Sequence, residues 1–207
     1  ISIQTPRGTE RVSTDCLAVS GGWNPTVHLT CHMNGRPAWN PEIASFIPSA
    51  GAIPGLLAAG ACNGAFSTAE CLAEGAKAAH DSLEALGIAG AEYELPQADH
   101  ATYALEPLWA VPGRGRAWLD FQNDVSVKDV KQAAIENFTS VEHMKRYTTQ
   151  GMATDQGKNS NVTALAVLSD ATGRGIPETG TTTFRPPYTP VALAALGAGA
   201  QGKGFAP

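Results

Sequence analysis

Apolar and small residues recur at helical spacing in the stretch that follows Ser67. Five of them are separated by three or four positions and fall on one face of a helix: Leu72, Ala76, Ala79, Leu83 and Leu86. Ser67 and Glu70 have the spacing of a capping box, in which the hydroxyl and the carboxylate each bond to a free amide at the helix N-terminus. Because Gly87 can end the helix, the pattern predicts one amphipathic helix over residues 67–86.

Three shorter helical patterns follow in the second half of the chain. Each has its own start signal: Ser126 with Asp129 before residues 127–137, Thr139 with Glu142 as a second capping box before residues 140–147, and Asn161 before residues 161–168. Gly151 is expected to stop the second helix, and the third is expected to end near Gly173. Short helices with small apolar faces need a surface to pack on. Residues 119–175 are therefore predicted to form a small helical module that packs on the first segment or on another subunit.

Strand patterns and glycine-rich turns dominate the first segment. Residues 11–20 predict a strand whose apolar second half indicates cover on both faces, and a turn at Gly21 and Gly22 follows. Residues 53–64 predict a second strand and a glycine-rich turn directly before the helix at 67–86. Such a unit aims free amides and the positive end of the helix dipole at the turn, which suits a pyrophosphate or ribityl group. The alternative is a turn that only lets the helix pack on a sheet. These units predict an α/β fold.

The remaining stretches lack sustained periodicity. Residues 89–118 are interrupted by prolines and glycines and are predicted to be a connector. Residues 176–207 begin with a proline-rich run that should be an extended linker, because a residue before proline disfavours helix. The chain is thus divided into residues 1–88, 89–118, 119–175 and 176–207. The start without Met and the Gly/Ala-rich end indicate a piece of a longer polypeptide.

Composition and charge exclude several classes of function. A net charge of -5 without a basic patch argues against nucleic acid as a partner, and no apolar run is long enough to cross a bilayer, so no membrane partner is expected. The N-terminus has no signal-peptide pattern. The cysteines show no metal spacing and are expected to be free thiols in the cytoplasm: Cys16, Cys31, Cys62 and Cys71.

Candidate catalytic and metal-ligating residues are few. His28 has no second ligand at metal spacing, so we expect it to be a packed or surface histidine. No Ser-His-Asp or Cys-His constellation can be assigned. We therefore predict no catalytic residue and no metal site in this chain.

The first segment resembles the closing part of flavoproteins of the pyridine nucleotide-disulfide oxidoreductase type, which contain two dinucleotide-binding domains. In that family a Gly-Asp pair in the turn before the helix holds the ribitol or ribose of the cofactor. At the matching position this chain has Gly60 and Ala61. The lost carboxylate argues against ordinary flavin binding.

The stretch from Asp120 to Ser160 resembles the small iron-sulfur module of bacterioferritin-associated ferredoxin type that is inserted in several flavin-dependent amine and amino-acid dehydrogenases. Asp120, Gln122, Asp155 and Ser160 stand where that module has its four cysteines. A [2Fe-2S] cluster needs soft thiolate ligands, so we predict that no iron-sulfur cluster binds. If the four side chains converge, they should hydrogen-bond to one another, to backbone or to water.

This cysteine-free version is similar to one branch of the superfamily, the alpha subunits of heterotetrameric bacterial sarcosine oxidases. Five motifs carry the similarity, at residues 20–29, 120–125, 140–149, 154–158 and 180–191. The resemblance implies oxidative demethylation of sarcosine to glycine, with the methyl carbon passed to tetrahydrofolate and hydrogen peroxide produced. It also implies FAD in the beta subunit, FMN at the interface with that subunit, a structural NAD in the alpha subunit, and gamma and delta subunits as further partners. The domain that would bind tetrahydrofolate lies outside this chain, which we expect to be inactive alone.

The resemblance also implies positions for cofactor contacts. NAD is expected near two turns: Gly21, Gly22, Gly60, Ala61, Asn63 and Gly64. Lys158 and Arg185, and also Lys145, are candidates to reach the FMN phosphate or the beta subunit, because Arg and Lys bind phosphate. For each cation the alternative is a solvated surface charge or an internal salt bridge. Two other functions remain open, an independent NAD(P)H-dependent flavin oxidoreductase and a non-catalytic scaffold.

Overall fold

Short strands pair as three antiparallel ribbons along the chain. The computed structural model describes residues 1–19, 21–91, 94–186 and 189–197. The ribbons are β1 (Ser2–Thr5) with β2 (Gly8–Arg11), β3 (Ala38–Asn40) with β4 (Ser45–Ile47), and β5 (Trp118–Asp120) with β6 (Val125–Ser126). The predicted mixture of helices and strands is confirmed, and every strand pair in the described ranges is antiparallel.

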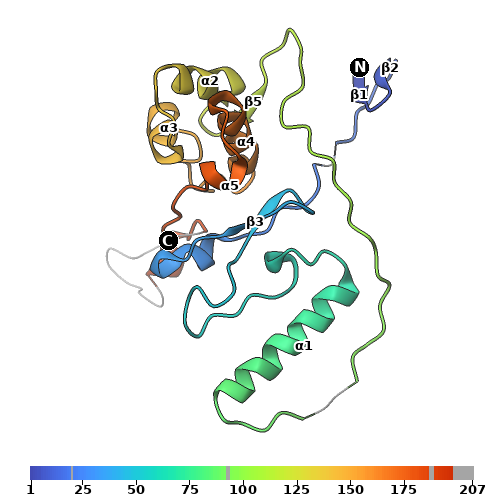
Figure 1. Cartoon of the computed structure of the whole chain (residues 1–207), viewed down its shortest axis with the longest axis vertical. Coiled ribbons are helices and arrows are strands. Elements are labelled where there is room, and N and C mark those ends of the chain that lie inside the picture. The colour runs from blue at the N-terminus through green and yellow to red at the C-terminus, as the bar shows by residue number, and fades with distance from the viewer. Residues whose placement is uncertain (20, 92–93, 187–188, 198–207) are drawn as a thin grey trace.

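The α-helices of residues 127–179 lie together in space, apart from α1 (Thr68–Ala85). The chain contains two 3-10 helices and six α-helices within the described residues: η1 (His28–Asn34), η2 (Gly60–Asn63), α1 (Thr68–Ala85), α2 (Val127–Ile135), α3 (Val141–Thr148), α4 (Asn161–Thr172), α5 (Ile176–Thr179) and α6 (Leu193–Leu196). Figure 1 shows α2 to α5 gathered with β5, whereas α1 lies apart from them. We call α2 to α5 with β5 and β6 the helical module.

α1 begins and ends where the sequence predicts. The Ser67 hydroxyl accepts a hydrogen bond from the Glu70 amide (3.2 Å), and the Glu70 carboxylate accepts one from the Ser67 amide (3.1 Å), which completes the capping box. At the other end Gly87 has a φ of 69°, and its amide donates to the Glu84 carbonyl (2.9 Å). None of the 18 residues of α1 is buried, and on its apolar face Leu72, Ala76 and Leu83 are half-buried, so the described part of the chain covers this face only partly.

The core lies in the helical module. α4 buries seven of its twelve residues and is contacted by α2, α5 and β5, while α3 packs on α2. The buried apolar residues of the module form one cluster: Leu119, Val125, Val130, Ala133, Val141, Met144, Ala164, Leu165, Val167 and Leu168. Phe46 of β4 belongs to the same cluster, so burial of apolar surface anchors the first half of the chain on the module.

Two of the three helices predicted in the module begin and end close to the predicted residues. Ser126 and Asp129 form the capping box of α2, with the Ser126 amide 2.8 Å from the Asp129 carboxylate. Gly173 caps α4 as expected. α3 ends slightly earlier than Gly151, because Thr149 already adopts the left-handed conformation with a φ of 65°.

The predicted capping box of Thr139 and Glu142 is wrong. Ser140 is the cap of α3, and its hydroxyl accepts a hydrogen bond from the His143 amide (3.2 Å). Two adjacent hydroxyl residues offer two registers for a cap, and the helix starts at the second. Glu142 then points to the tail, where its carboxylate accepts the Thr183 amide (2.7 Å).

Two predicted strands are not formed. β2 ends at Arg11, residues 12–19 contain no strand, and Leu17 and Val19 are 60% and 81% exposed. Residues 53–59 are likewise irregular. An apolar run becomes a buried strand only where a neighbouring strand supplies hydrogen bonds and other layers cover its faces. The described residues supply neither at these two places.

The proline-rich tail is not wholly extended. Residues 176–179 form the short helix α5, with Pro177 in its first turn, where the missing amide of proline leaves no helical hydrogen bond unmade. The predicted linker beyond residue 197 lies outside the described residues.

The state of the cysteines agrees with the prediction from the sequence. All four are free, as predicted, and Cys31 is buried while Cys16 is exposed. Among the described residues, no helix has the length and apolar character that crossing a membrane requires.

Candidate functional site

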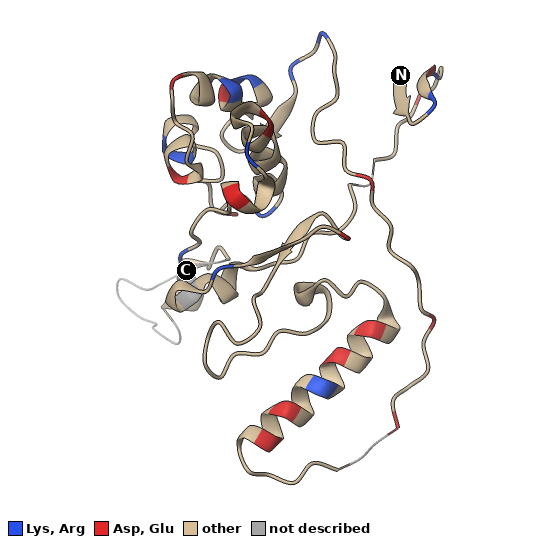
Figure 2. Cartoon of the chain, in the orientation of Figure 1, with Lys and Arg blue, Asp and Glu red and all other residues tan. Residues whose placement is uncertain are grey.

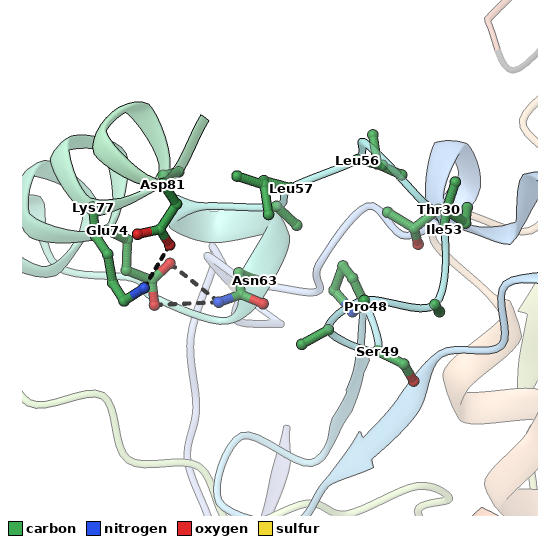
Figure 3. Close-up of a pocket in the computed structure, with 15 residues that line it drawn as sticks. Thr30, Pro48, Ser49, Ile53, Leu56, Leu57, Asn63, Glu74, Lys77 and Asp81 are labelled. Atoms are coloured by element: carbon green, nitrogen blue, oxygen red, sulfur yellow. Dashed lines mark hydrogen bonds and ion pairs between the residues drawn. The ribbon is translucent and has the colours of Figure 1, made fainter. Parts of the chain in front are cut away.

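A cavity of about 260 Å³ lies between α1 and the irregular segment that follows β4 (Figure 3). One wall is apolar and contains Ile53, Leu56 and Leu57. The opposite wall is the polar side of α1, with Glu74, Lys77 and Asp81, and Asn63 of η2 lies between the two walls. The cavity therefore combines an apolar surface with a small number of directed polar groups, as small-molecule sites do.

Glu74 is bonded to the turn that the sequence singles out. Its carboxylate accepts the Gly60 amide at 2.8 Å, and the Asn63 side-chain amide lies 3.3 Å from each carboxylate oxygen. The Gly60 amide, expected to be free for a phosphate, is thus already used by a carboxylate. A second anion at the same amide would have to displace Glu74.

The charges on α1 also disfavour an anion in this cavity. Figure 2 shows acidic positions along the whole length of α1 with a single Lys or Arg position among them. That residue, Lys77, lies 2.6 Å from Asp81, and the hydrogen bond to Asp81 raises the pKa of Lys77. Because Lys77 is paired with Asp81, the negative charge of Glu74 determines the charge of the polar wall of the cavity.

Four of the six residues predicted near NAD lie at this turn. Gly60, Ala61 and Asn63 are part of η2, and Gly64 caps it with a φ of 92°. A Cβ on Gly64 would meet Ile43 and Ile47 side chains at 3.0 and 3.1 Å, so only glycine fits there without rearrangement. Asn63 is the one of the four that lines the cavity within the described residues.

Gly22 lies against a different part of the chain, whereas a Cβ on Gly21 would meet nothing within 4 Å. Gly22 has a φ of 81°, and a Cβ at this position would lie 2.7 Å from the Tyr103 hydroxyl. That hydroxyl accepts the Trp23 amide (3.1 Å), and the Tyr103 ring lies 4.6 Å from the Phe66 ring, just before α1. Tyr103 therefore links the turn at Gly22 to the start of α1.

Asp120 joins the two loops that carry the positions of the expected cysteines. Its side chain is 3% exposed and accepts the amides of Gln122 (2.8 Å) and Asn123 (3.2 Å) in its own loop. The second carboxyl oxygen accepts the Gly151 amide (2.9 Å) in the other loop. One buried carboxyl group thus holds both loops of the helical module.

The other three positions are held by similar contacts. The Gln122 side chain accepts the Thr154 hydroxyl (3.5 Å), Asp155 accepts the Gly157 amide (3.1 Å), and the Ser160 hydroxyl accepts the Gln150 side-chain amide (2.7 Å). These bonds to backbone and neighbouring side chains are of the expected kind, and the Gln122 amide also donates to Asp120, but these contacts join no two of the four side chains to each other. In the part of the chain that the structure describes, no group of three His, Cys, Asp or Glu residues could hold a metal ion.

Asn161 packs against a glycine at the start of α4. Its side-chain amide donates to the Gln156 carbonyl (3.3 Å) and to the Thr182 hydroxyl (2.9 Å), which ties the tail to the module. A Cβ on Gly157 would lie 2.2 to 2.6 Å from the Asn161 side chain, and Gly157 has a φ of 73°. Both the backbone conformation and the available space therefore require glycine at position 157.

Gly157→Ala is expected to lower the free energy of unfolding by about 3–4 kcal/mol. Positive φ costs an alanine about 1–2 kcal/mol, and the displaced Asn161 loses two hydrogen bonds of about 1 kcal/mol each. Gly173→Ala is the matched control, since Gly173 has a φ of 67° and a Cβ there meets nothing within 4 Å. Urea unfolding measures the stability of the two variants. Equal losses of stability would show that the Asn161 side chain can move away from residue 157 without loss of free energy.

His28 is buried where η1 meets the tail. It is 4% exposed, its ring lies 3.8 Å from the Phe184 ring, and Val27 and Cys31 complete the apolar cluster. Neither ring nitrogen has a partner at ideal hydrogen-bond geometry among the described residues, although the Gln156 backbone lies close enough to influence the ring. Burial lowers the pKa of His28 to about 4, the charge of Lys158 adds to this effect, and Asp155 and the Gln156 backbone oppose it. The expectation of a packed histidine is confirmed.

The structure brings together the loop of Lys158 and the tail that carries Arg185. The Gln156 side chain donates to the Arg185 carbonyl (2.5 Å) and accepts the Arg185 amide (2.9 Å). Lys145 instead forms a salt bridge with Glu142 (3.6 Å), which is the alternative considered for each of these cations. Contacts of Lys158 and Arg185 with FMN or another subunit remain predictions.

Comparison with known proteins assigns the chain to a family. The model of the Sarcosine oxidase A3 domain matches residues 114–200. The sarcosine oxidase subunit alpha of Rhizobium meliloti (strain 1021) is 43% identical over 202 residues, which cover 96% of this chain and 20% of that protein. The chain belongs to the family of sarcosine oxidase alpha subunits. Subunit alpha of Corynebacterium sp. (strain P-1) is 40% identical over 206 residues, which cover 94% of this chain and 21% of that protein. The chain therefore spans about a fifth of the length of these alpha subunits.

A solved structure has a similar fold. L-proline dehydrogenase from P. horikoshii superposes with a TM-score of 0.62 and 20% identity, over 84% of this chain and 37% of that chain. At this level of identity the similarity concerns the fold alone. Membership of the sarcosine oxidase alpha-subunit family confirms the resemblance found in the five sequence motifs.

Sequence reasoning missed Glu74, Gln150 and Tyr103. Glu74 follows Glu70 by one helical turn, so its place on the polar side of α1 could be predicted, but its contact with Gly60 depends on how the turn folds back. Gln150 and Tyr103 lie in stretches without periodicity, where no sequence signal indicates a partner.

Proposed function

We propose that this chain is a segment of the alpha subunit of a bacterial sarcosine oxidase complex. The complex would oxidatively demethylate sarcosine to glycine in the cytoplasm, pass the methyl carbon to tetrahydrofolate and produce hydrogen peroxide. The observation that carries this proposal is 43% identity with an alpha subunit over 96% of the chain. The proposed partners are the beta, gamma and delta subunits. FAD belongs to the beta subunit, FMN to its interface with the alpha subunit, and tetrahydrofolate to a domain outside this chain.

The role that we infer for the first segment is to hold NAD as a structural group. It would form the end of a dinucleotide-binding domain in a fold with two such domains. Gly60, Ala61, Asn63 and Gly64 would lie beside the dinucleotide, with Gly21 and Gly22 nearby. The cavity supports this assignment because Asn63 and Glu74 present polar groups opposite the apolar side chains of Leu56 and Leu57.

The role that we infer for the helical module is to hold the domains and subunits of the complex in fixed relative positions. The module resembles an iron-sulfur module in the positions of its two loops. It differs in the side-chain atoms that would have to bind iron. Asp120, Gln122, Asp155 and Ser160 offer hard oxygen atoms that already take part in hydrogen bonds, and these atoms do not fit a [2Fe-2S] cluster. Lys158 and Arg185 would support the FMN site, where Arg and Lys can neutralise a phosphate.

The proposed function is tested by producing the complete alpha subunit together with the beta, gamma and delta subunits. We expect hydrogen peroxide to form when sarcosine is added, and we expect NAD, FAD and FMN in the purified complex without iron or acid-labile sulfide. The bound NAD should stay oxidised during turnover, so absorbance at the wavelength of NADH should not rise. A yellow alpha subunit that NADH reduces without any partner would instead support an independent flavin oxidoreductase. Normal flavin chemistry with weakened assembly after removal of NAD would indicate a scaffold.

A further inference from the structure

We propose that Glu74 binds the ribose of the dinucleotide and supplies the carboxylate that position 61 lacks. This inference rests on the proposed NAD site. The sequence has alanine where related flavoproteins have aspartate, yet the same turn receives a carboxylate from α1. The Glu74 carboxylate lies 2.8 Å from the Gly60 amide and 3.3 Å from the Asn63 side-chain nitrogen. A carboxylate is therefore restored at the turn by a residue 13 positions further along the chain.

The Glu74 carboxylate is oriented and still has room for a ligand. A carboxylate offers about four lone-pair sites. Gly60 occupies one of them, and the Asn63 amide is shared between both oxygens. The remaining sites can accept two hydroxyl hydrogens, which matches the vicinal diol of a ribose. In dinucleotide-binding folds an acidic residue takes this role.

The cavity is too small for the whole dinucleotide but large enough for one of its two nucleoside halves. About 260 Å³ is below the range of roughly 300–1,000 Å³ that is typical of sites for whole drug-sized ligands. It suits a nucleoside, whose base can lie against Leu56 and Leu57, which are 39% and 51% exposed.

The charges place the diphosphate outside the cavity. The Gly60 amide is already used, and α1 presents carboxylates along its length while Lys77 is paired with Asp81. A neutral ribose that donates hydrogen bonds is favoured at this wall, whereas a diphosphate would be repelled from it.

The first experiment measures NAD in the complete alpha subunit within its complex. Glu74→Gln keeps an oxygen for the Gly60 amide but offers fewer acceptor sites and no charge. Hydrogen bonds to charged groups are strong enough that their loss should weaken NAD binding about tenfold or more. Bound NAD, released with acid and quantified by an enzymatic cycling assay, should therefore fall sharply. Glu84→Gln is the control, because Glu84 is an exposed residue of α1 outside the cavity lining and loses the same charge.

The second experiment asks whether Glu74 contacts the hydroxyl groups themselves. Subunits stripped of NAD are titrated with NAD and with the analogue that lacks the 2′-hydroxyl of both riboses. The wild type should bind the analogue about tenfold more weakly, since a lost hydrogen bond to a charged group has about this effect. Glu74→Gln should bind both ligands equally.

The outcomes separate failure of this inference from failure of the proposed function. A wild-type complex without NAD would reject the NAD site and, with it, the role of Glu74. Normal NAD in Glu74→Gln would reject the role of Glu74 alone. Loss of NAD in Glu74→Gln with undiminished preference for NAD over the analogue would also overturn the inference, because Glu74 would then only support the turn.

Discussion

Asp120→Ala is expected to lower the free energy of unfolding of the chain by about 2–4 kcal/mol, since one buried and two partly buried amides lose their acceptor and a fully buried unsatisfied amide costs about 1–3 kcal/mol. The amides belong to Gln122, Asn123 and Gly151, so both loops of the helical module are affected. Urea unfolding followed by circular dichroism measures the loss. Hydrogen exchange at the Gly151 amide should accelerate in the variant, because that amide loses its bond.

Two control variants show whether the loss of stability comes from the Asp120 carboxyl group. Asp120→Asn keeps one acceptor oxygen and is expected to lose about half as much stability. Asp170→Ala removes an exposed carboxylate at the end of α4 and should change stability by less than about 0.5 kcal/mol. An Asp120→Ala variant as stable as Asp170→Ala would mean that the loops of the module do not depend on this carboxyl group.

Acidification is expected to destabilise the chain by about 3 kcal/mol through His28 alone, which follows from its pKa of about 4 in the folded state and 6.5 in the unfolded chain. Between these values the unfolded chain takes up a proton and the folded one does not. The contribution of neutral His28 is therefore complete above pH 6.5 and is lost as the pH falls towards 4. The free energy of unfolding, measured by urea titration across this pH range, should show the decline.

A histidine-free variant isolates the contribution of His28. His28→Leu keeps an apolar contact with Phe184 and removes the ionisable ring. The difference in stability between the wild type and this variant should be constant above pH 6.5 and should change steadily in favour of the variant below it. His80→Gln, which removes an exposed histidine of α1, is measured in parallel as the control for the loss of a histidine. Parallel curves for the wild type and His28→Leu would contradict the assigned burial effect.

Local signals predicted the helices better than the strands. The Ser67–Glu70 box acts within one turn of backbone, so α1 could be located from residues that are neighbours in sequence. Residues 16–19 have an equally clear apolar pattern but form no strand. A strand needs partners that are distant in sequence, and no pattern within residues 11–20 reveals whether they are available. The error at Ser140 is of another kind, because Thr139 and Ser140 compete for one cap.

The sequence predicted the backbone turn of the candidate site but not the charged side chain that contacts this turn. The resemblance located Gly60 and Asn63, which form the turn before α1. It did not reveal that Glu74 reaches back to the Gly60 amide, since that contact depends on the tertiary path between η2 and α1. The alternative of an internal salt bridge proved right for Lys145, whose partner Glu142 lies one helical turn away.

The contact between His28 and Phe184 has a consequence for the order of folding. All elements of the helical module lie within residues 118–179, so its contacts close shorter loops than the contact between His28 and Phe184 does. The ring of Phe184, by contrast, covers residues close to the other end of the chain. Closing so long a loop is slow, even though its entropic cost grows only with the logarithm of its length. During synthesis from the N-terminus, η1 therefore stays without its apolar cover until Phe184 has left the ribosome.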